Sequence, residues 1–159
     1  MDTPPELARA QKLAEDGSFD DSIAICDAVL AGEPDSAAAL SLKGWCLDQQ
    51  GKREEALRAF QEAVKHLPVY APLRKQLGQA YADFGRAEEA VAEFSEALRL
   101  DPKDADALIK RGACRLATTE LKEGLQDIKD AVAMDGSLHE RGEEICRAFA
   151  AAHKLDLGL

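Results

Sequence analysis

A period of 34 residues runs through most of the chain and constrains its fold more than any other feature of the sequence. Small and turn-forming residues keep this step at Gly17, Gly51 and Gly85, at Pro34, Pro68 and Pro102, and at Ala10, Gly44, Gly78 and Gly112. Larger apolar residues keep it at Cys26, Phe60, Phe94 and Ile128. Because separate columns agree on one period, the sequence predicts a stack of similar units.

Each period predicts two helices joined by a short turn. In the third unit Leu73 and Leu77 lie on one stripe of helical spacing, and Phe94 and Leu98 lie on the next. The glycine column falls between the two stripes and suits the left-handed conformation that ends a helix. The proline column follows the second stripe and prevents that helix from continuing.

The third unit carries the fullest motif. Its signature residues are Leu77, Gly78, Tyr81, Gly85, Ala90, Phe94, Ala97 and Pro102. This pattern resembles the tetratricopeptide repeat. The resemblance implies an all-α fold, a right-handed solenoid of four tetratricopeptide-type helix pairs plus a C-terminal capping helix. We expect a single domain over residues 1–159, with repeats at 3–36, 37–70, 71–104 and 105–138 and a capping helix and tail at 139–159.

The fourth unit departs from this pattern. Arg115 replaces the family's tyrosine, Thr119 the turn glycine, Gly124 the alanine and Gly136 the proline. A glycine inside a helix costs about 1 kcal/mol relative to alanine. We therefore expect the fourth unit to be the least stable.

The segment after the repeats has the pattern of an amphipathic helix. Ser137, followed three residues later by Glu140, predicts a capping-box start. Ile145, Cys146 and Phe149 share an apolar face. A helix of this kind closes the open end of a solenoid.

Charge and composition exclude several classes of partner. The chain has 20 basic and 30 acidic residues, a net charge of −10, which disfavours nucleic acid and anionic membranes. No apolar run approaches the roughly 20 residues that span a bilayer, and the first residues do not resemble a signal peptide. The four cysteines are widely spaced. These features predict a protein of the reducing cytoplasm that contacts no membrane.

No catalytic or metal-binding motif is visible. His66, His139 and His153 stand apart, and no nucleophile elbow, phosphate loop or dinucleotide fingerprint occurs. Cys46 and Cys114 take the repeat place of Ala80, so we expect the cysteines to be packing residues. The sequence therefore predicts a protein that is not an enzyme and has no catalytic residue, metal or cofactor.

In tetratricopeptide proteins the first helices of successive repeats line a concave groove that holds a peptide, strand or helix. By that resemblance, the partner-binding side chains are Leu7, Gln11, Trp45, Asp48, Lys75, Gln79, Asp83, Ile109 and Leu116. Trp45 is the candidate anchor because the other residues of its column are polar or small, although packing on a neighbouring helix is the alternative. One subfamily grips a terminal carboxylate with lysine, asparagine and arginine. This chain has no asparagine, which argues against such a clamp.

These features predict a protein–protein interaction module, monomeric or weakly dimeric. Residues 1–36 carry nine acids and two bases, a net charge of −7, so the peptide or helix that binds is expected to be basic or amphipathic. Two alternatives stay open: a secretion-type chaperone for an export substrate, and a regulatory subunit of an enzyme.

Overall fold

The computed structural model describes residues 5–153; the tail predicted after the capping helix lies outside this range. Within it the chain forms α-helices, one 3-10 turn and no strand, which confirms the all-α prediction. The helices are α1 (Pro5–Glu15), α2 (Phe19–Gly32), α3 (Ala37–Gln49), α4 (Arg53–His66), α5 (Ala71–Asp83), α6 (Ala87–Leu100), α7 (Ala105–Ala117), α8 (Leu121–Met134) and α9 (His139–His153), with the 3-10 turn η1 at Gly136–Leu138.

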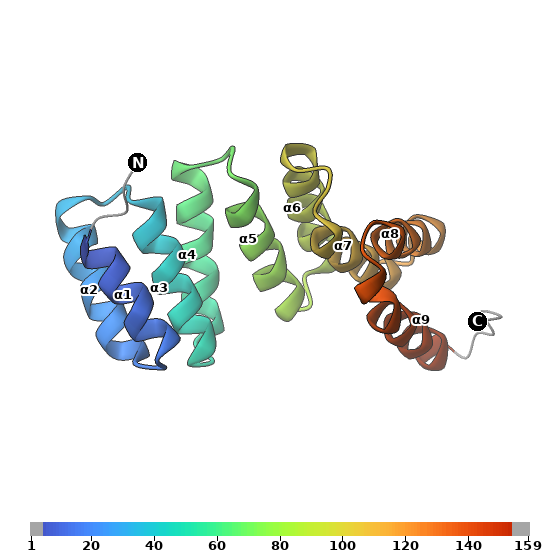
Figure 1. Ribbon diagram of the computed structural model, residues 1–159, viewed down its shortest axis with the longest axis horizontal. Coiled ribbons are helices and arrows are strands. Elements are labelled where there is room, and N and C mark those ends of the chain that lie inside the picture. The colour runs from blue at the N-terminus through green and yellow to red at the C-terminus, as the bar shows by residue number, and fades with distance from the viewer. Residues whose placement is uncertain (1–4, 154–159) are drawn as a thin grey trace. The chain divides into compact units, whose positions relative to one another are not determined.

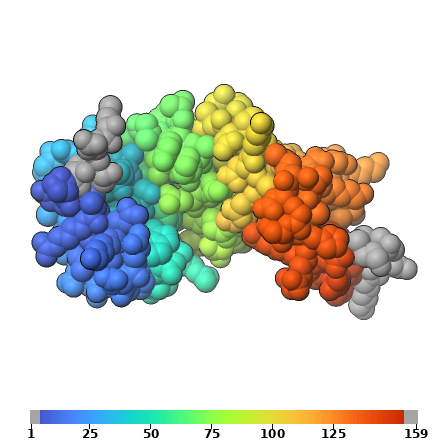
Figure 2. Space-filling model, in the orientation of Figure 1, coloured from blue at the N-terminus to red at the C-terminus, as the bar shows by residue number. Residues whose placement is uncertain are grey.

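The chain divides into two compact units, Met1–Ala80 and Tyr81–Leu159. In the first unit α1 packs on α2, α2 on α3 and α3 on α4 (Figure 1). In the second unit α6 packs on α7 and α7 on α8, while α9 contacts both α7 and α8. The helices thus follow one another in packed pairs, as the repeat pattern predicts. Most side chains of α1 lie at the surface of the first unit (Figure 2).

The turn inside each pair has the same backbone geometry. Gly17, Gly51 and Gly85 have φ of +81°, +75° and +72°, which confirms the predicted left-handed turns. Thr119, at the same repeat place, has φ of +69°. In all four turns the next residue donates its backbone N–H, over 2.8–2.9 Å, to the carbonyl five residues earlier. The fourth repeat therefore keeps the turn without the glycine that favours it.

Thr119→Gly is expected to raise the free energy of unfolding by about 1 kcal/mol. A β-branched residue is strained in the left-handed region, whereas glycine enters it freely. Chemical denaturation measures the change. Gly85→Ala makes the opposite exchange at the equivalent turn and should destabilise by a similar amount. A destabilised Thr119→Gly protein would contradict this interpretation.

Two helix pairs approach closely at glycines. A Cβ on Gly44 of α3 would lie 2.9 Å from the Phe60 ring of α4. A Cβ on Gly112 of α7 would lie 2.8 Å from the backbone carbonyl oxygen of Gly124 in α8, and a Cβ on Gly124 would lie 3.0 Å from that of Gly112. Gly124 lowers the helix propensity of α8, but its missing side chain lets α8 pack closely on α7.

Gly112→Ala is expected to lower the free energy of unfolding by about 1–3 kcal/mol, because the added methyl group meets backbone that cannot move aside. Gly32→Ala is the matched control, since a Cβ at Gly32 meets nothing within 4 Å. It should stabilise α2 by up to about 1 kcal/mol through helix propensity. Thermal or urea unfolding of the two proteins gives the comparison. Shifts in the same direction would refute the packing argument.

The fourth repeat contains buried ion pairs between α7 and α8. Asp127 of α8 is buried and accepts two hydrogen bonds from Arg111 of α7, Nε to Oδ2 at 2.8 Å and Nη2 to Oδ1 at 2.7 Å. Arg115 donates Nη1 to Asp127 Oδ2 at 2.8 Å. Arg115, which replaces the family's tyrosine, therefore joins α7 to α8 through an ion pair.

The start of α9 differs from the prediction. The backbone N–H of Ser137 is bound by the side chain of Asp135 at 2.9 Å, and residues 136–138 form η1 before α9 begins at His139. The side chain of Asp135 therefore caps η1, and Ser137 lies inside that turn instead of capping α9. The predicted apolar face is present: Cys146 is buried, and Ile145 and Phe149 pack against the same core cluster.

All four cysteines are buried free thiols, as expected for packing residues. Burial, with smaller effects from the nearby Cys46 and Asp27, raises the pKa of the Cys26 thiol from 9.0 to about 11. Burial likewise raises the pKa of Cys114 to about 11, with a smaller effect from Asp83. The folded protein therefore holds these protons more tightly than the unfolded chain does.

This difference predicts that stability falls as the pH rises through the interval from about 9 to 11. Below pH 9 both states are protonated and the contribution is complete; near pH 11 it is lost. One pKa unit corresponds to about 1.4 kcal/mol, so each thiol contributes roughly 2–3 kcal/mol. In this interval the free energy of unfolding should fall less steeply with pH in the Cys26→Ala/Cys114→Ala protein. Identical slopes would show that other groups cause the loss.

Candidate peptide-binding groove

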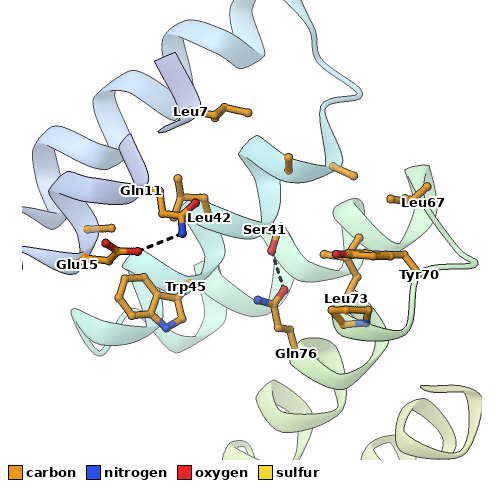
Figure 3. A pocket seen from close by; sticks show the side chains of 14 residues that line it. Leu7, Gln11, Glu15, Ser41, Leu42, Trp45, Leu67, Tyr70, Leu73 and Gln76 are labelled. Atoms are coloured by element: carbon orange, nitrogen blue, oxygen red, sulfur yellow. Dashed lines mark hydrogen bonds between the residues drawn. The ribbon is translucent and has the colours of Figure 1, made fainter. Parts of the chain in front are cut away.

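The first helices of the first three predicted repeats, α1, α3 and α5, line one groove of about 550 Å³ in the first unit (Figure 3). We call it the α1–α3–α5 groove. Its lining residues are Leu7, Gln11, Ala14, Glu15, Ala37, Ala38, Ser41, Leu42, Trp45, Leu67, Tyr70, Pro72, Leu73 and Gln76. Its volume lies within the range of about 300–1,000 Å³ that is typical of ligand sites.

The groove has a buried apolar floor and an exposed apolar end. Leu7 and Leu73 are nearly inaccessible, with 3% and 4% of their surface exposed. Leu67 and Tyr70, on the segment between α4 and α5, are 41% and 50% exposed although both are large apolar side chains. An exposed apolar surface beside a groove is typical of a binding site.

Polar side chains lie between and opposite these apolar groups. Ser41 of α3 donates its hydroxyl to Gln76 Oε1 of α5 at 2.6 Å, which joins the two helices across the groove. Gln11 Nε2 of α1 donates to Glu15 Oε1 at 3.1 Å. The amide of Gln76 accepts through oxygen, so its nitrogen keeps two N–H groups that can donate to a ligand.

Trp45 lines the groove and is half-buried. Its ring meets the ring of Phe19 of α2 edge to face, with centroids 5.9 Å apart and planes at 75°. Figure 3 shows the indole beneath the side chains of Gln11 and Glu15. Trp45 thus packs on a neighbouring helix and also lines the groove, and its role as an anchor for a partner stays a prediction.

The structure brings together three of the residues predicted to bind a partner, Leu7, Gln11 and Trp45. Three others of the first unit, Asp48, Lys75 and Gln79, belong to α3 and α5 but do not line this groove. All three are half-buried.

The remaining predicted residues, Asp83, Ile109 and Leu116, belong to the second unit. Asp83 is exposed near Cys114. Ile109 and Leu116 are 0% and 2% exposed, so they offer a partner no accessible surface, contrary to their predicted role in binding. Both belong to a core cluster that includes Ile128 of α8 and Cys146 of α9.

Sequence reasoning missed Leu67, Tyr70 and Gln76. Leu67 and Tyr70 belong to the segment between two helices, which the helical pattern does not place on any face. The signal was available: apolar residues flank Pro68 where polar turn residues are usual.

The described residues show no other chemistry at this site. No group of three or more His, Cys, Asp or Glu in residues 5–153 could hold a metal ion. None of the helices described here combines the length and apolar character needed to cross a membrane. The arrangement offers apolar surface, amide donors and acceptors, and one carboxylate, which are the means of binding a segment of protein.

The fold and the groove define an all-α repeat protein in which α1, α3 and α5 line one groove. Residues 13–77 match the family model described as tetratricopeptide repeat, and residues 78–116 match the one described as TPR repeat. Together these matches cover more than half of the chain. The chain belongs to the tetratricopeptide repeat family.

Relatives carry the repeat inside much longer proteins. The chain is 31% identical over 113 residues to the probable UDP-N-acetylglucosamine–peptide N-acetylglucosaminyltransferase SPINDLY of Solanum lycopersicum, covering 63% of this chain and 12% of that protein. It is 28% identical over 148 residues to a DnaJ homolog subfamily C member 7 homolog of Schizosaccharomyces pombe, covering 83% and 29%. The chain thus spans less than a third of either relative.

Solved structures confirm the fold. YrrB, described as a TPR protein with an unusual peptide-binding site, superimposes with a TM-score of 0.83 at 20% identity, over 96% of this chain and 78% of that one. MamA superimposes with a TM-score of 0.83 at 18% identity, over 98% and 88%.

Proposed function

We propose that this chain is a protein–protein interaction module that binds a peptide or helix of a partner protein in the α1–α3–α5 groove. The observation that carries the proposal is the groove itself, in which three first helices and the exposed side chains of Leu67 and Tyr70 enclose about 550 Å³. Tetratricopeptide domains generally bind other proteins, and the similar structure of YrrB is described as having a peptide-binding site.

The lining narrows the class of ligand. None of the fourteen residues that line the groove is lysine or arginine. A C-terminal carboxylate needs such a cation, so we do not expect this groove to bind the C-terminus of a partner through its charge. Apolar and aromatic anchors supply the affinity, and the neutral groups of Gln11, Ser41 and Gln76 orient the ligand.

The test uses peptides selected from a random-peptide display library against the whole chain. Each selected peptide is synthesised with blocked ends, and its affinity is measured by fluorescence anisotropy. Tyr70→Ala should weaken binding by about tenfold or more, because an exposed aromatic side chain at the groove is lost. Val69→Ala is the matched control: Val69 is 69% exposed and does not line the groove.

Binding that Tyr70→Ala weakens and Val69→Ala leaves unchanged supports the proposal. Failure to select any peptide, or equal affinities for both variants and the parent, would overturn it.

A further inference from the structure

The α1–α3–α5 groove carries charge at one place. Glu15, the last residue of α1, is the one charged side chain among the residues that line it. Its carboxylate is exposed, and the partner that the structure gives it is the neutral amide of Gln11, at 3.1 Å. This hydrogen bond orients the carboxylate but leaves its negative charge uncompensated.

An aromatic ring lines the same groove as this charge. Figure 3 shows the Trp45 indole just below the Glu15 carboxylate, and both side chains line the groove. The edge-to-face contact with Phe19 holds the indole in place. Tryptophan attracts cations to the face of its ring more strongly than other aromatic residues do, and a carboxylate binds lysine and arginine directly.

Resting on the function proposed above, we infer that the groove selects a segment with a lysine or arginine side chain, which binds between Glu15 and Trp45. The rest of the groove determines which kind of side chain the other end of the segment carries. Leu67 and Tyr70 lie on the side away from Glu15 in Figure 3 and form an apolar surface. The ligand is therefore a segment with a basic residue at one end and a large apolar or aromatic residue at the other.

The charge of the surrounding surface agrees with this chemistry. Residues 1–36 carry nine acids and two bases, so the field around α1 attracts cationic segments and repels acidic ones. The attraction speeds association and is screened by salt. Affinity for the basic segment should accordingly fall as the ionic strength rises.

The experiment compares peptides and protein variants in pairs, with the display-selected peptides as probes. We expect the selected sequences to be enriched in lysine or arginine together with an aromatic residue. Replacing arginine by citrulline, or lysine by norleucine, should weaken binding to the parent protein by about tenfold. Glu15→Gln keeps the shape of the side chain and its hydrogen bond with Gln11. This change should weaken the binding of the unmodified peptide by a similar factor. The two changes together should cost little more than either alone.

Glu55→Gln removes the same charge from an exposed position of α4 that does not line the groove, and should leave the affinity unchanged. Peptides that lose affinity with Tyr70→Ala but contain no basic residue, or that bind Glu15→Gln as well as the parent protein, would overturn this inference and leave the proposed function standing. Peptides whose affinity changes with neither Glu15→Gln nor Tyr70→Ala would overturn both this inference and the proposed function.

Discussion

Asp127→Ala is expected to lower the free energy of unfolding by about 3–5 kcal/mol, the largest change in stability that we predict for a single residue. The side chain of Asp127 is 7% exposed and pairs with Arg111 and Arg115, whose side chains are 17% and 21% exposed. Removing the carboxylate leaves the largely buried guanidinium group of Arg111 without its partner, and leaves Arg115 with Glu120, whose Oε2 lies 3.4 Å from Arg115 Nε. Urea denaturation, followed by circular dichroism, measures the loss.

A nearby residue gives the control for this prediction. Asp130 lies one turn further along α8, is exposed, and accepts a hydrogen bond from Gln126. Asp130→Ala should change stability by no more than about 0.5 kcal/mol. Comparable losses for the two variants would mean that the ion pairs contribute little.

The second repeat suggests a rescue. At the places of Arg115 and Asp127 it has Leu47 and Ala59, and both of these are buried. Adding Arg115→Leu to Asp127→Ala installs this apolar pair and removes a guanidinium group that has lost its buried partner. We expect the double variant to recover at least about 1 kcal/mol of the loss. A double variant less stable than Asp127→Ala would show that Arg115 stabilises the repeat in another way.

Trp45→Ala is expected to weaken the binding of a selected peptide by about 2–4 kcal/mol, the largest effect on affinity that we predict. The indole lines the groove and is half-buried, so part of its surface remains available to a ligand. Stability should fall less, by about 0.5–1.5 kcal/mol for the lost contact with Phe19. Anisotropy of a labelled peptide and urea denaturation measure the two quantities separately.

Trp45→Phe keeps a ring at this position and should retain most of the affinity. A core tryptophan would behave differently, costing about 3–5 kcal/mol of stability when truncated. If Trp45→Ala unfolds early while the variant binds peptide with unchanged affinity, Trp45 is a packing residue and the groove lacks its anchor.

The helix pairs could be predicted because the repeat encodes them many times over. Gly17, Gly51 and Gly85 each indicate a left-handed turn, and the structure has one at each place. Thr119 adopts the same turn although its sequence does not favour it, because the packing of α7 on α8 requires the chain to reverse there. Tertiary packing thus decides where local preference is weak.

The fourth repeat shows where single-residue reasoning reaches its limit. Gly124 weakens α8 when considered alone, yet its missing side chain admits the backbone of Gly112. Arg115 departs from the family pattern, and Asp127 compensates for it from another helix. In both cases the two residues are 12 positions apart in sequence and lie on different helices, so the pattern of a single helix does not connect them.

The candidate site could be predicted in the first repeats and not in the fourth. The helical pattern placed Leu7, Gln11 and Trp45 on the groove, and all three line it, with Leu7 almost fully buried at its floor. The same pattern placed Ile109 among the binding residues, but it is fully buried in a core cluster to which α8 and α9 both contribute. Periodicity gives equivalent residues the same face without indicating which copy is covered by a later helix.

The most direct test of the central claim, that the α1–α3–α5 groove is the binding site, is a titration of isotope-labelled protein with a selected peptide, followed by nuclear magnetic resonance. We predict shift changes at the Trp45 indole N–H, at the side-chain amides of Gln11 and Gln76, and at the backbone of Ser41 and Tyr70. Amides of the outer helices α2 and α4 should move little. Changes concentrated on α2 and α4, with the Trp45 and Gln76 signals unmoved, would contradict the account.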